Sequence, residues 1–329
     1  MFKESAMLQK IKTRYWNLRA KVRAKSYQGL FSVINFAVWC RHLPDLFASR
    51  RCGTPEISAR SACCIDVDSG KVVAQKNHHF RYAPASIVKL ATALVLVSSG
   101  KLLKDEYVTI EASDVAEPVG SSMKLKQGDI VSYLDLLYGM LLASGNDAAR
   151  ATARAIGQTM LQDESATGDP TIRFVAAMNE LADSLGMKST RFCNPSGQDL
   201  WRQYSTACDL AILASAAFSN PVIQDVISVR EHIAKIQGDN ARDEALLSTL
   251  DNIDRTQVVG GKTGTTINAR ACLALLLKQR SGERVVIVTL GSELDSVTEG
   301  ERRITSLSRY KDMEKMIEHV QSPGTGFRG

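Results

Sequence analysis

A serine and a lysine three residues apart stand at the entrance to a long apolar run. Ser86 and Lys89 lead directly into Leu90–Val97, in which Thr92 is the single polar residue. This run is typical of a buried helix, and the spacing places both side chains on one helix face, about one turn apart. Burial lowers the pKa of a lysine, so its neutral amine can take the proton of an otherwise poorly nucleophilic serine. The pattern predicts a buried Ser–Lys pair at a helix N-terminus, whose free N–H groups stabilise developing negative charge.

The Ser-x-x-Lys spacing is short, and the chain contains it a second time. Ser121 and Lys124 have the same spacing, but they follow Pro118 and Gly120, and no apolar run comes after them. We expect this second copy to form a polar turn rather than a helix. The spacing alone therefore does not identify a nucleophile, and the interpretation depends on further motifs.

Length and charge exclude some classes of function. The chain has 329 residues, of which 44% are hydrophobic, so it can bury a large core as one domain or two. The formal charge is +6, and much of the excess lies in the first 26 residues. The remainder is nearly balanced and has no basic face interleaved with aromatic residues. We therefore expect no nucleic acid as a partner of the folded part.

The chain divides into four segments by composition. We predict a basic N-terminal extension, an apolar segment with a linker, a folded domain and a short tail, at residues 1–26, 27–55, 56–322 and 323–329. The apolar run 29–40 is too short for an ordinary spanning helix, but it suits a signal-peptide core or a membrane anchor. Arg41 and His42 directly after it argue against export. A helix that packs on the domain is the alternative.

The cysteines and histidines do not form a recognisable framework. Seven cysteines are scattered through the chain, too few for a disulfide scaffold of this length. Cys63 and Cys64 are adjacent in a strand-like run, so we expect at most one of them to face the core. No Cys-x-x-Cys or His-x-x-x-His pair occurs, and His78 and His79 have no partner cluster in the sequence. The prediction is a protein with no metal and no cofactor.

Strand-like patterns at both ends of the domain enclose a helical middle. Runs at 61–67 and 71–75 predict a β-hairpin, and 103–110 and 120–128 resemble short strands and turns. Helices are predicted at 133–142, 147–156, 174–185 and 206–218. Three strands at 258–264, 271–278 and 283–290 precede a final helix at 300–320. We expect an α/β fold, with an antiparallel sheet flanked by helices plus a mainly helical subdomain.

A second motif lies between two of the predicted helices. Ser144 and Asn146, separated by Gly145, form a junction that can aim two short polar side chains into a cleft. A hydroxyl there can pass a proton to a leaving amine. An amide can bind a substrate carbonyl or hold a lysine in place. The alternative is a simple helix cap.

A third motif is the glycine-rich stretch that precedes a predicted strand. Residues 260–266 contain Lys262 and Thr263, which can hold a carboxylate, and glycines that let an extended ligand approach a sheet edge. A phosphate-binding loop is the rival interpretation. It would require glycine where Thr256 stands and a helix rather than a strand afterwards, so we reject it.

The three motifs in this order match the set found in penicillin-binding proteins and class A β-lactamases. The chain resembles the D-alanyl-D-alanine carboxypeptidase family, the low-molecular-mass penicillin-binding serine peptidases, from about residue 57 to about residue 290. The stretches that carry this resemblance are Arg81–Ser86, Gly120–Met123, Leu141–Ala149, Asn194–Gly197 and Gly261–Gly264. The resemblance implies a β-lactamase/transpeptidase-like fold. Gln198 departs from the family pattern, which usually has leucine there.

The resemblance also implies an activity and its residues. Ser86 would attack the carbonyl between the two terminal D-alanines of a peptidoglycan stem, with Lys89 as base. Ser144 and Asn146 would serve proton transfer and substrate positioning. The substrate-binding residues would be Lys262, Thr263, Gly264 and Thr265, and the backbone N–H groups of Ser86 and Thr265 would form the oxyanion hole.

The implied partners are peptidoglycan stem peptides as substrates and β-lactam antibiotics as inhibitors. The implied location is periplasmic or otherwise extracytoplasmic, with inner-membrane association through residues 29–40.

Three alternatives stay open within the same fold. A D,D-endopeptidase would cleave cross-links with the same residues, and a regulatory protein would bind penicillins or peptides without turnover. A β-lactamase needs a Glu-x-x-Leu-Asn motif, and the nearest stretch, Glu244–Ser248, ends in serine and lies just before the third motif. The intact motifs favour a carboxypeptidase over a binding protein.

Overall fold

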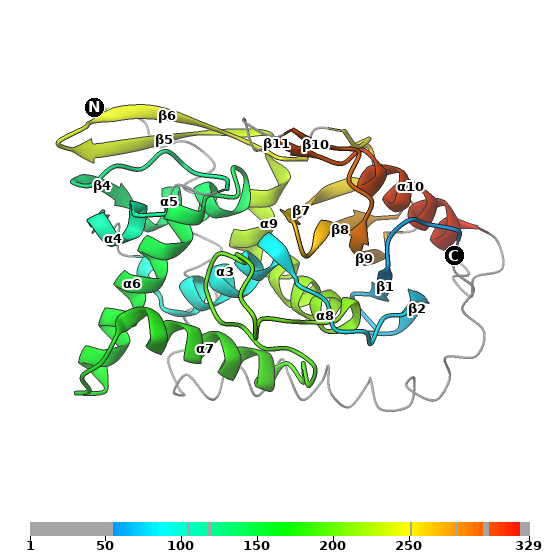
Figure 1. The fold of residues 1–329 in the computed structure, drawn as a ribbon, viewed down its shortest axis with the longest axis horizontal. Helices are drawn as coiled ribbons and strands as arrows, with labels where there is room; N and C mark the ends of the chain where they lie inside the picture. Colours follow the sequence, from blue (N-terminus) through cyan, green and yellow to red (C-terminus); the bar gives the residue numbers. More distant parts are fainter. Residues whose placement is uncertain are drawn as a thin grey trace.

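The computed structural model describes residues 55–103, 106–117, 120–250, 252–279, 282–298 and 303–322. The apolar run 29–40 and the predicted terminal segments lie outside these ranges. Within them, no single helix is both long and apolar enough to cross a membrane. Figure 1 shows a five-stranded sheet with its covering helices beside a mainly helical part that carries a smaller sheet. The predicted α/β architecture is confirmed.

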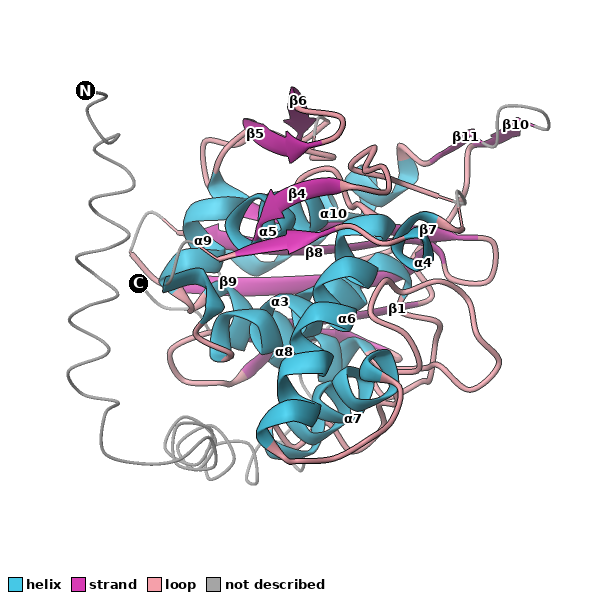
Figure 2. Ribbon diagram, turned by 90° about the vertical axis from the view of Figure 1, so that its left-hand side faces the viewer, coloured by secondary structure: helices cyan, strands magenta, loops and turns pink. Residues whose placement is uncertain are grey.

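The five-stranded sheet is built from both ends of the domain. Its strand order is β2 (Val72–Lys76), β1 (Ser61–Asp66), β9 (Arg284–Ser292), β8 (Arg270–Lys278) and β7 (Val258–Thr266). Every neighbouring pair is antiparallel. The predicted hairpin and the three predicted C-terminal strands are confirmed. β7, which carries the third motif, forms one edge of the sheet (Figure 2).

Helices cover both faces of this sheet. α8 (Ala207–Phe218) packs against β1 and β9, and α10 (Ser308–Gln321) packs against β8 and β9. Cys63 belongs to the core that contains α8, whereas Cys64 belongs to the core that contains α10, and both side chains are fully buried. The expectation that at most one of these cysteines faces a core is therefore wrong, because successive side chains of a strand point to opposite faces and both faces are covered.

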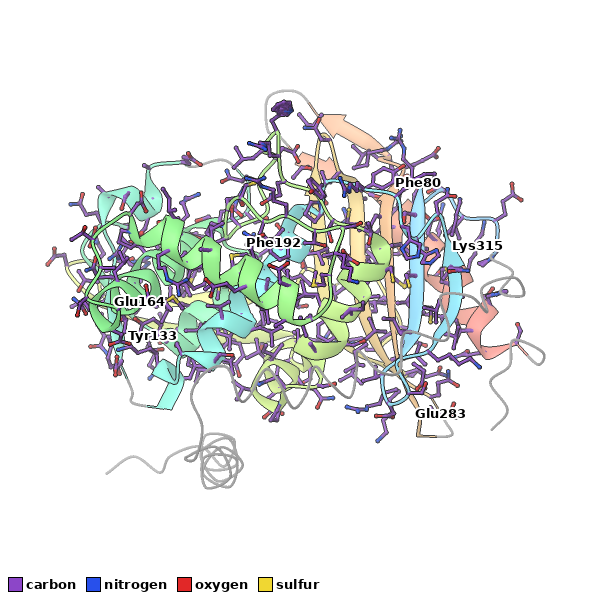
Figure 3. The ribbon with its side chains drawn as sticks, turned by 90° about the horizontal axis from the view of Figure 1, so that it is seen from below. Phe80, Tyr133, Glu164, Phe192, Glu283 and Lys315 are labelled. Carbon is purple, nitrogen blue, oxygen red and sulfur yellow. The ribbon has the colours of Figure 1, made fainter. Side chains whose placement is uncertain are left out.

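The predicted apolar helix is the centre of the second part. It begins with a 3₁₀ turn, η1 (Ala85–Val88), continues as α3 (Lys89–Ser98), and packs against α5 (Tyr133–Leu141), α6 (Asn146–Asp163) and α7 (Pro170–Ser184). Phe192, labelled near the middle of Figure 3, is buried in the same core.

Two of these helices are longer than predicted. α6 extends past residue 156, and α7 starts before residue 174. The start of α7 follows from local chemistry: the Asp169 carboxylate accepts hydrogen bonds from the N–H groups of Thr171 and Ile172, and Pro170 occupies the first turn.

Several elements were missed from the sequence. The pairing of β5 (Glu231–Gly238) with β6 (Arg242–Leu247) extends β3 (Tyr107–Thr109) and β4 (Asp129–Ser132) into a four-stranded sheet. Residues 120–128, expected to include short strands, form a loop. The last helix begins at 308 rather than 300 because the preceding residues form β11. The remaining elements are η2 (Lys101–Leu103), α4 (Ala112–Val115), α9 (Pro221–Ser228), β10 (Ser296–Thr298) and β11 (Arg303–Thr305).

Candidate active site

The predicted Ser–Lys pair is formed where η1 becomes α3. Residues at i and i+3 are eclipsed in a 3₁₀ turn, so Ser86 and Lys89 lie one above the other. Lys89 Nζ is 3.0 Å from Ser86 Oγ. The lysine is fully buried, whereas the serine is half-buried and can meet a ligand.

Two further groups hold the amine of Lys89 beside the serine. Its Nζ donates to Asn146 Oδ1 at 2.7 Å and to the carbonyl oxygen of Ser196 at 2.6 Å. Burial lowers the pKa of Lys89 well below its ordinary value, and the positive charge of Lys262 lowers it further. Both effects favour the neutral amine, which is the form that can accept a proton.

The backbone at this site is strained at two residues other than glycine. Ala85, which precedes Ser86, has φ of 48°, and Ser144 has φ of 59°. Such left-handed conformations cost energy and recur where the surrounding structure imposes them at functional sites. Gly197 supports the first of them, because a Cβ atom at Gly197 would lie 2.0 Å from the carbonyl oxygen of Ala85.

The second and third motifs meet through a hydrogen bond between their side chains. Lys262 extends from β7, and its Nζ donates to Ser144 Oγ at 2.8 Å and to the carbonyl oxygen of Thr263 at 2.9 Å. Burial lowers the pKa of Lys262 to about 7, with a smaller contribution from Arg309. Near neutral pH this lysine therefore carries its charge for part of the time, in a setting where a carboxylate would stabilise it.

A glycine allows β7 to approach the turn that carries the serine. A Cβ atom at Gly264 would lie 2.9 Å from the backbone nitrogen of Ser86 and 3.0 Å from the Cβ atom of Ala85. β7, which contains Thr265, contacts η1, which contains Ser86. A two-donor oxyanion hole would need backbone N–H groups on two neighbouring segments of this kind.

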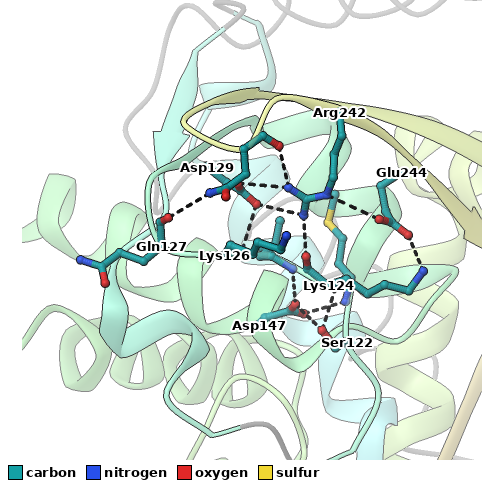
Figure 4. Close-up of polar contacts among 11 residues, drawn as sticks. Ser122, Lys124, Lys126, Gln127, Asp129, Asp147, Arg242 and Glu244 are labelled. Atoms are coloured by element: carbon teal, nitrogen blue, oxygen red, sulfur yellow. Dashed lines mark hydrogen bonds and ion pairs between the residues drawn. The ribbon is translucent and has the colours of Figure 1, made fainter.

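The loop that contains the second Ser-x-x-Lys copy is clamped beside this site (Figure 4). The buried carboxylate of Asp147 accepts hydrogen bonds from Ser122 Oγ at 2.6 Å and from the N–H groups of Met123 at 2.9 Å and Leu125 at 3.1 Å. The neighbouring residue, Asn146, donates its backbone N–H to the carbonyl of Ser121 at 2.8 Å. The loop therefore supports the residue that contacts Lys89.

Sequence reasoning missed the contribution of the last helix. Arg309 of α10 is buried, and its Nη2 donates to Thr265 Oγ1 at 2.6 Å. Its guanidinium also lies close enough to Lys262 to lower the pKa of that lysine. A single arginine in an amphipathic helix carries no sequence signal of this role. The carbonyl of Ser196 could have been suspected, because the Asn194–Gly197 stretch was part of the family resemblance.

The comparisons with known proteins agree on one family. The family described as D-alanyl-D-alanine carboxypeptidase matches residues 48–293. D-alanyl-D-alanine carboxypeptidase DacF of Bacillus subtilis (strain 168) is 32% identical over 238 residues, which are 70% of this chain and 57% of that protein. D-alanyl-D-alanine carboxypeptidase DacC of Escherichia coli (strain K12) is 33% identical over 286 residues, which are 83% of this chain and 64% of that protein. The chain thus spans less than two thirds of either relative.

A solved structure extends the comparison to three dimensions. The crystal structure of the Streptomyces K15 DD-transpeptidase matches with a TM-score of 0.70 and 26% sequence identity, covering 82% of this chain and 98% of that chain. Since the sequence match spans most of the domain and the fold agrees, this chain belongs to the D-alanyl-D-alanine carboxypeptidase family.

Proposed function

We propose that this protein is a serine D,D-carboxypeptidase that removes the terminal D-alanine from peptidoglycan stem pentapeptides. The observation that carries the proposal is the contact of the half-buried Ser86 hydroxyl with the fully buried amine of Lys89. Asn146 and Ser196 hold that amine, so it is aimed at the hydroxyl rather than at solvent. A serine activated in this way is suited to acyl transfer.

We infer the course of the reaction from the arrangement of these groups. Ser86 Oγ attacks the carbonyl carbon of the peptide bond between the two D-alanines, and its proton passes to Lys89. The N–H groups of Ser86 and Thr265 bind the oxyanion, a contribution worth about 10²–10³ in rate for one donor. When the tetrahedral intermediate collapses, the C–N bond breaks, and the leaving amine takes a proton through Ser144. Water then hydrolyses the ester on Ser86.

The terminal carboxylate of the substrate would bind on β7. Lys262 and Thr263 supply a cationic and a hydroxyl donor, Gly264 gives access, and Thr265 is held by Arg309. Two cationic side chains near one another favour an anionic ligand, and the edge position of β7 lets an extended peptide pair with it. A preference for substrates with a free terminal carboxylate follows.

The partners of this proposal are peptidoglycan stem peptides as substrates and β-lactam antibiotics as inhibitors, because a β-lactam carbonyl would acylate the same serine. Such substrates lie outside the cytoplasmic membrane, so we place the domain in an extracytoplasmic, and more specifically periplasmic, location. Attachment to the inner membrane through residues 29–40 belongs to the same proposal and rests on the sequence alone.

Time-resolved intact-mass spectrometry with benzylpenicillin tests the acylation step. We expect a persistent penicilloyl adduct on the parent protein and on the Ser121→Ala variant, and none on Ser86→Ala. Ser121→Ala is the matched control because it changes the serine of the second motif copy. An adduct that persists in Ser86→Ala would disprove the assignment of the nucleophile, and rapid consumption of penicillin without an adduct would favour a β-lactamase.

Release of D-alanine from a stem pentapeptide tests the reaction itself. A penicilloyl adduct together with D-alanine release is expected for a carboxypeptidase. Cleavage of cross-linked dimers with no release from the pentapeptide would instead favour the endopeptidase. An adduct with neither activity would contradict the proposed enzyme and favour a binding protein.

A further inference from the structure

A cluster of three metal-ligating side chains lies outside the site described above. His78 and His79 belong to the connection between β2 and η1, and Cys208 is the second residue of α8. The ligand atoms of these three side chains all lie within 4.8 Å of one another. This cluster has no local sequence pattern, because Cys208 lies 130 residues after His78.

Backbone hydrogen bonds hold the two segments in place. The N–H of Cys208 donates to the carbonyl of His78 at 3.0 Å. Further along, Tyr82 and Ser205 exchange backbone hydrogen bonds of 2.7 and 2.9 Å. The cluster is therefore preorganised by main-chain contacts, and only side-chain rotations are needed to change the distances between its ligand atoms.

We propose that His78, His79 and Cys208 bind a zinc ion. Two imidazole nitrogens and one thiolate form a donor set typical of tetrahedral Zn²⁺, with bonds of about 2.0–2.1 Å to nitrogen and about 2.3 Å to sulfur. These bond lengths place the ligand atoms about 3.3–3.6 Å apart. Closing the cluster from a spread of at most 4.8 Å thus takes a movement of up to about 1.5 Å, which the exposed His79 side chain can make. Water completes the fourth position.

The two histidine rings supply the nitrogen donors of this cluster. The two rings lie side by side, with centroids 3.9 Å apart, so one ion can reach a nitrogen of each.

One neighbouring group contacts the cysteine of the cluster. The side chain of Cys63, fully buried on β1, forms a hydrogen bond with that of Cys208. Outer partners of this kind orient metal ligands and adjust their basicity.

The ion would fasten the segment that leads to the nucleophile. The chain from His78 runs eight residues to Ser86, and Cys208 lies at the start of the helix that packs against β1. His79 is exposed and the next residue, Phe80, is 60% exposed, so an ion can reach the cluster from solvent. The proposed site does not depend on the proposed activity.

Cobalt substitution tests this proposal with the full chain. We would strip the reduced protein with a chelator, titrate Co²⁺, and then displace it with Zn²⁺. The expected signature is a thiolate-to-cobalt charge-transfer band with visible bands of tetrahedral cobalt, at a stoichiometry of one. Because ligation requires the thiolate, Zn²⁺ binding should also release a proton and raise the thermal unfolding temperature.

Three variants separate the site from other thiols and histidines. Cys208→Ser and His79→Ala should each weaken binding at least about a hundredfold, because loss of an outer partner alone costs about 10–100-fold. Cys193→Ser, which removes another half-buried thiol, should bind as the parent does. His79 is exposed, so its replacement preserves folding. Cobalt binding without the thiolate band, or equal binding by Cys208→Ser and the parent, would overturn the proposal.

Discussion

Two segments of this protein have the same Ser-x-x-Lys spacing and opposite environments. Ser86 and Lys89 lie on a 3₁₀ turn that continues into a buried helix, and the lysine has no exposed surface. Ser121 and Lys124 lie in a loop, where Lys124 has φ of 62° and a side chain that is 73% exposed. Its Nζ pairs with Glu244 at 2.5 Å, which leaves it a solvated cation.

The difference shows which structural conditions a Ser-x-x-Lys pair needs in order to be reactive. A helical turn aligns the two side chains, and the apolar run that follows removes the amine from water, which lowers its pKa. The second copy has neither the helical turn nor the apolar run. Ser122, which follows Ser121, donates a hydrogen bond to Asp147. The same residues therefore form a reactive pair in one place and part of a loop clamp in the other.

The largest expected effect is on the rate of acylation when Lys89, the proposed base of the first copy, is replaced. Lys89→Met keeps an unbranched side chain of similar length but removes the amine, so we expect acylation by benzylpenicillin to slow by about 10²–10⁴-fold. Lys124→Met is the matched control and should react within about twofold of the parent, because its amine is a solvated surface group. The acylation rate constant by intact-mass spectrometry, with circular dichroism to verify folding, provides the comparison. A Lys89→Met variant as fast as Lys124→Met would disprove the role of the base.

The second effect concerns pH. Burial lowers the pKa of Lys262 to about 7, so its charged form dominates below that pH and is lost as the pH rises through it. Because that charge would hold the substrate carboxylate, kcat/KM for a pentapeptide should fall at high pH, approaching about tenfold per unit. At lower pH it should fall as Lys89 becomes protonated.

Lys262→Arg sharpens this test. A guanidinium stays charged throughout the accessible range, so the fall of kcat/KM above pH 7 should disappear in the variant even if its maximum is lower. Lys124→Arg should leave the profile unchanged. A high-pH fall that persists in Lys262→Arg would show that a different group controls it.

The parts of the fold that could be predicted are those with strong local patterns. The apolar run after Lys89, the β1–β2 hairpin and the three C-terminal strands were all found from periodicity and turn residues. β5 and β6 were missed because their exposed residues give weak alternation, and they acquire order by pairing with β4 and with one another. The burial of Cys64 depends on α10, which no local pattern connects to β1.

The residues of the candidate site also divide into those that could be predicted from the sequence and those that could not. Five residues could be selected because they lie in three ordered motifs, and the structure brings them together. They are Ser86, Lys89, Ser144, Asn146 and Lys262. Arg309 could not be assigned, because its contribution arises from a tertiary contact. The contact of the Ser196 carbonyl with Lys89 is also tertiary, and only the family resemblance of Asn194–Gly197 pointed to that stretch. The His78–Cys208 cluster has the same origin: two segments far apart in sequence meet only in the folded chain.

The smallest expected effect on reactivity comes from the clamp that holds the second copy. In Asp147→Asn, one carboxylate oxygen becomes an NH₂ group that faces other donors, so some of the bonds from Ser122, Met123 and Leu125 are lost. We expect the free energy of unfolding, measured by urea titration, to fall by about 1–3 kcal/mol, the typical cost of unsatisfied buried polar groups.

Acylation of Asp147→Asn should slow less than tenfold, because the clamp reaches Asn146 through the backbone contact with Ser121 and does not hold the Lys89 amine itself. Lys124→Met again serves as the control, and its exposed ion pair should change the free energy of unfolding by no more than about 1 kcal/mol. If Asp147→Asn unfolds as the parent does but loses acylation as severely as Lys89→Met, the second copy contributes to the chemistry directly. In that case, burial and helical alignment would not be what separates the two Ser-x-x-Lys segments.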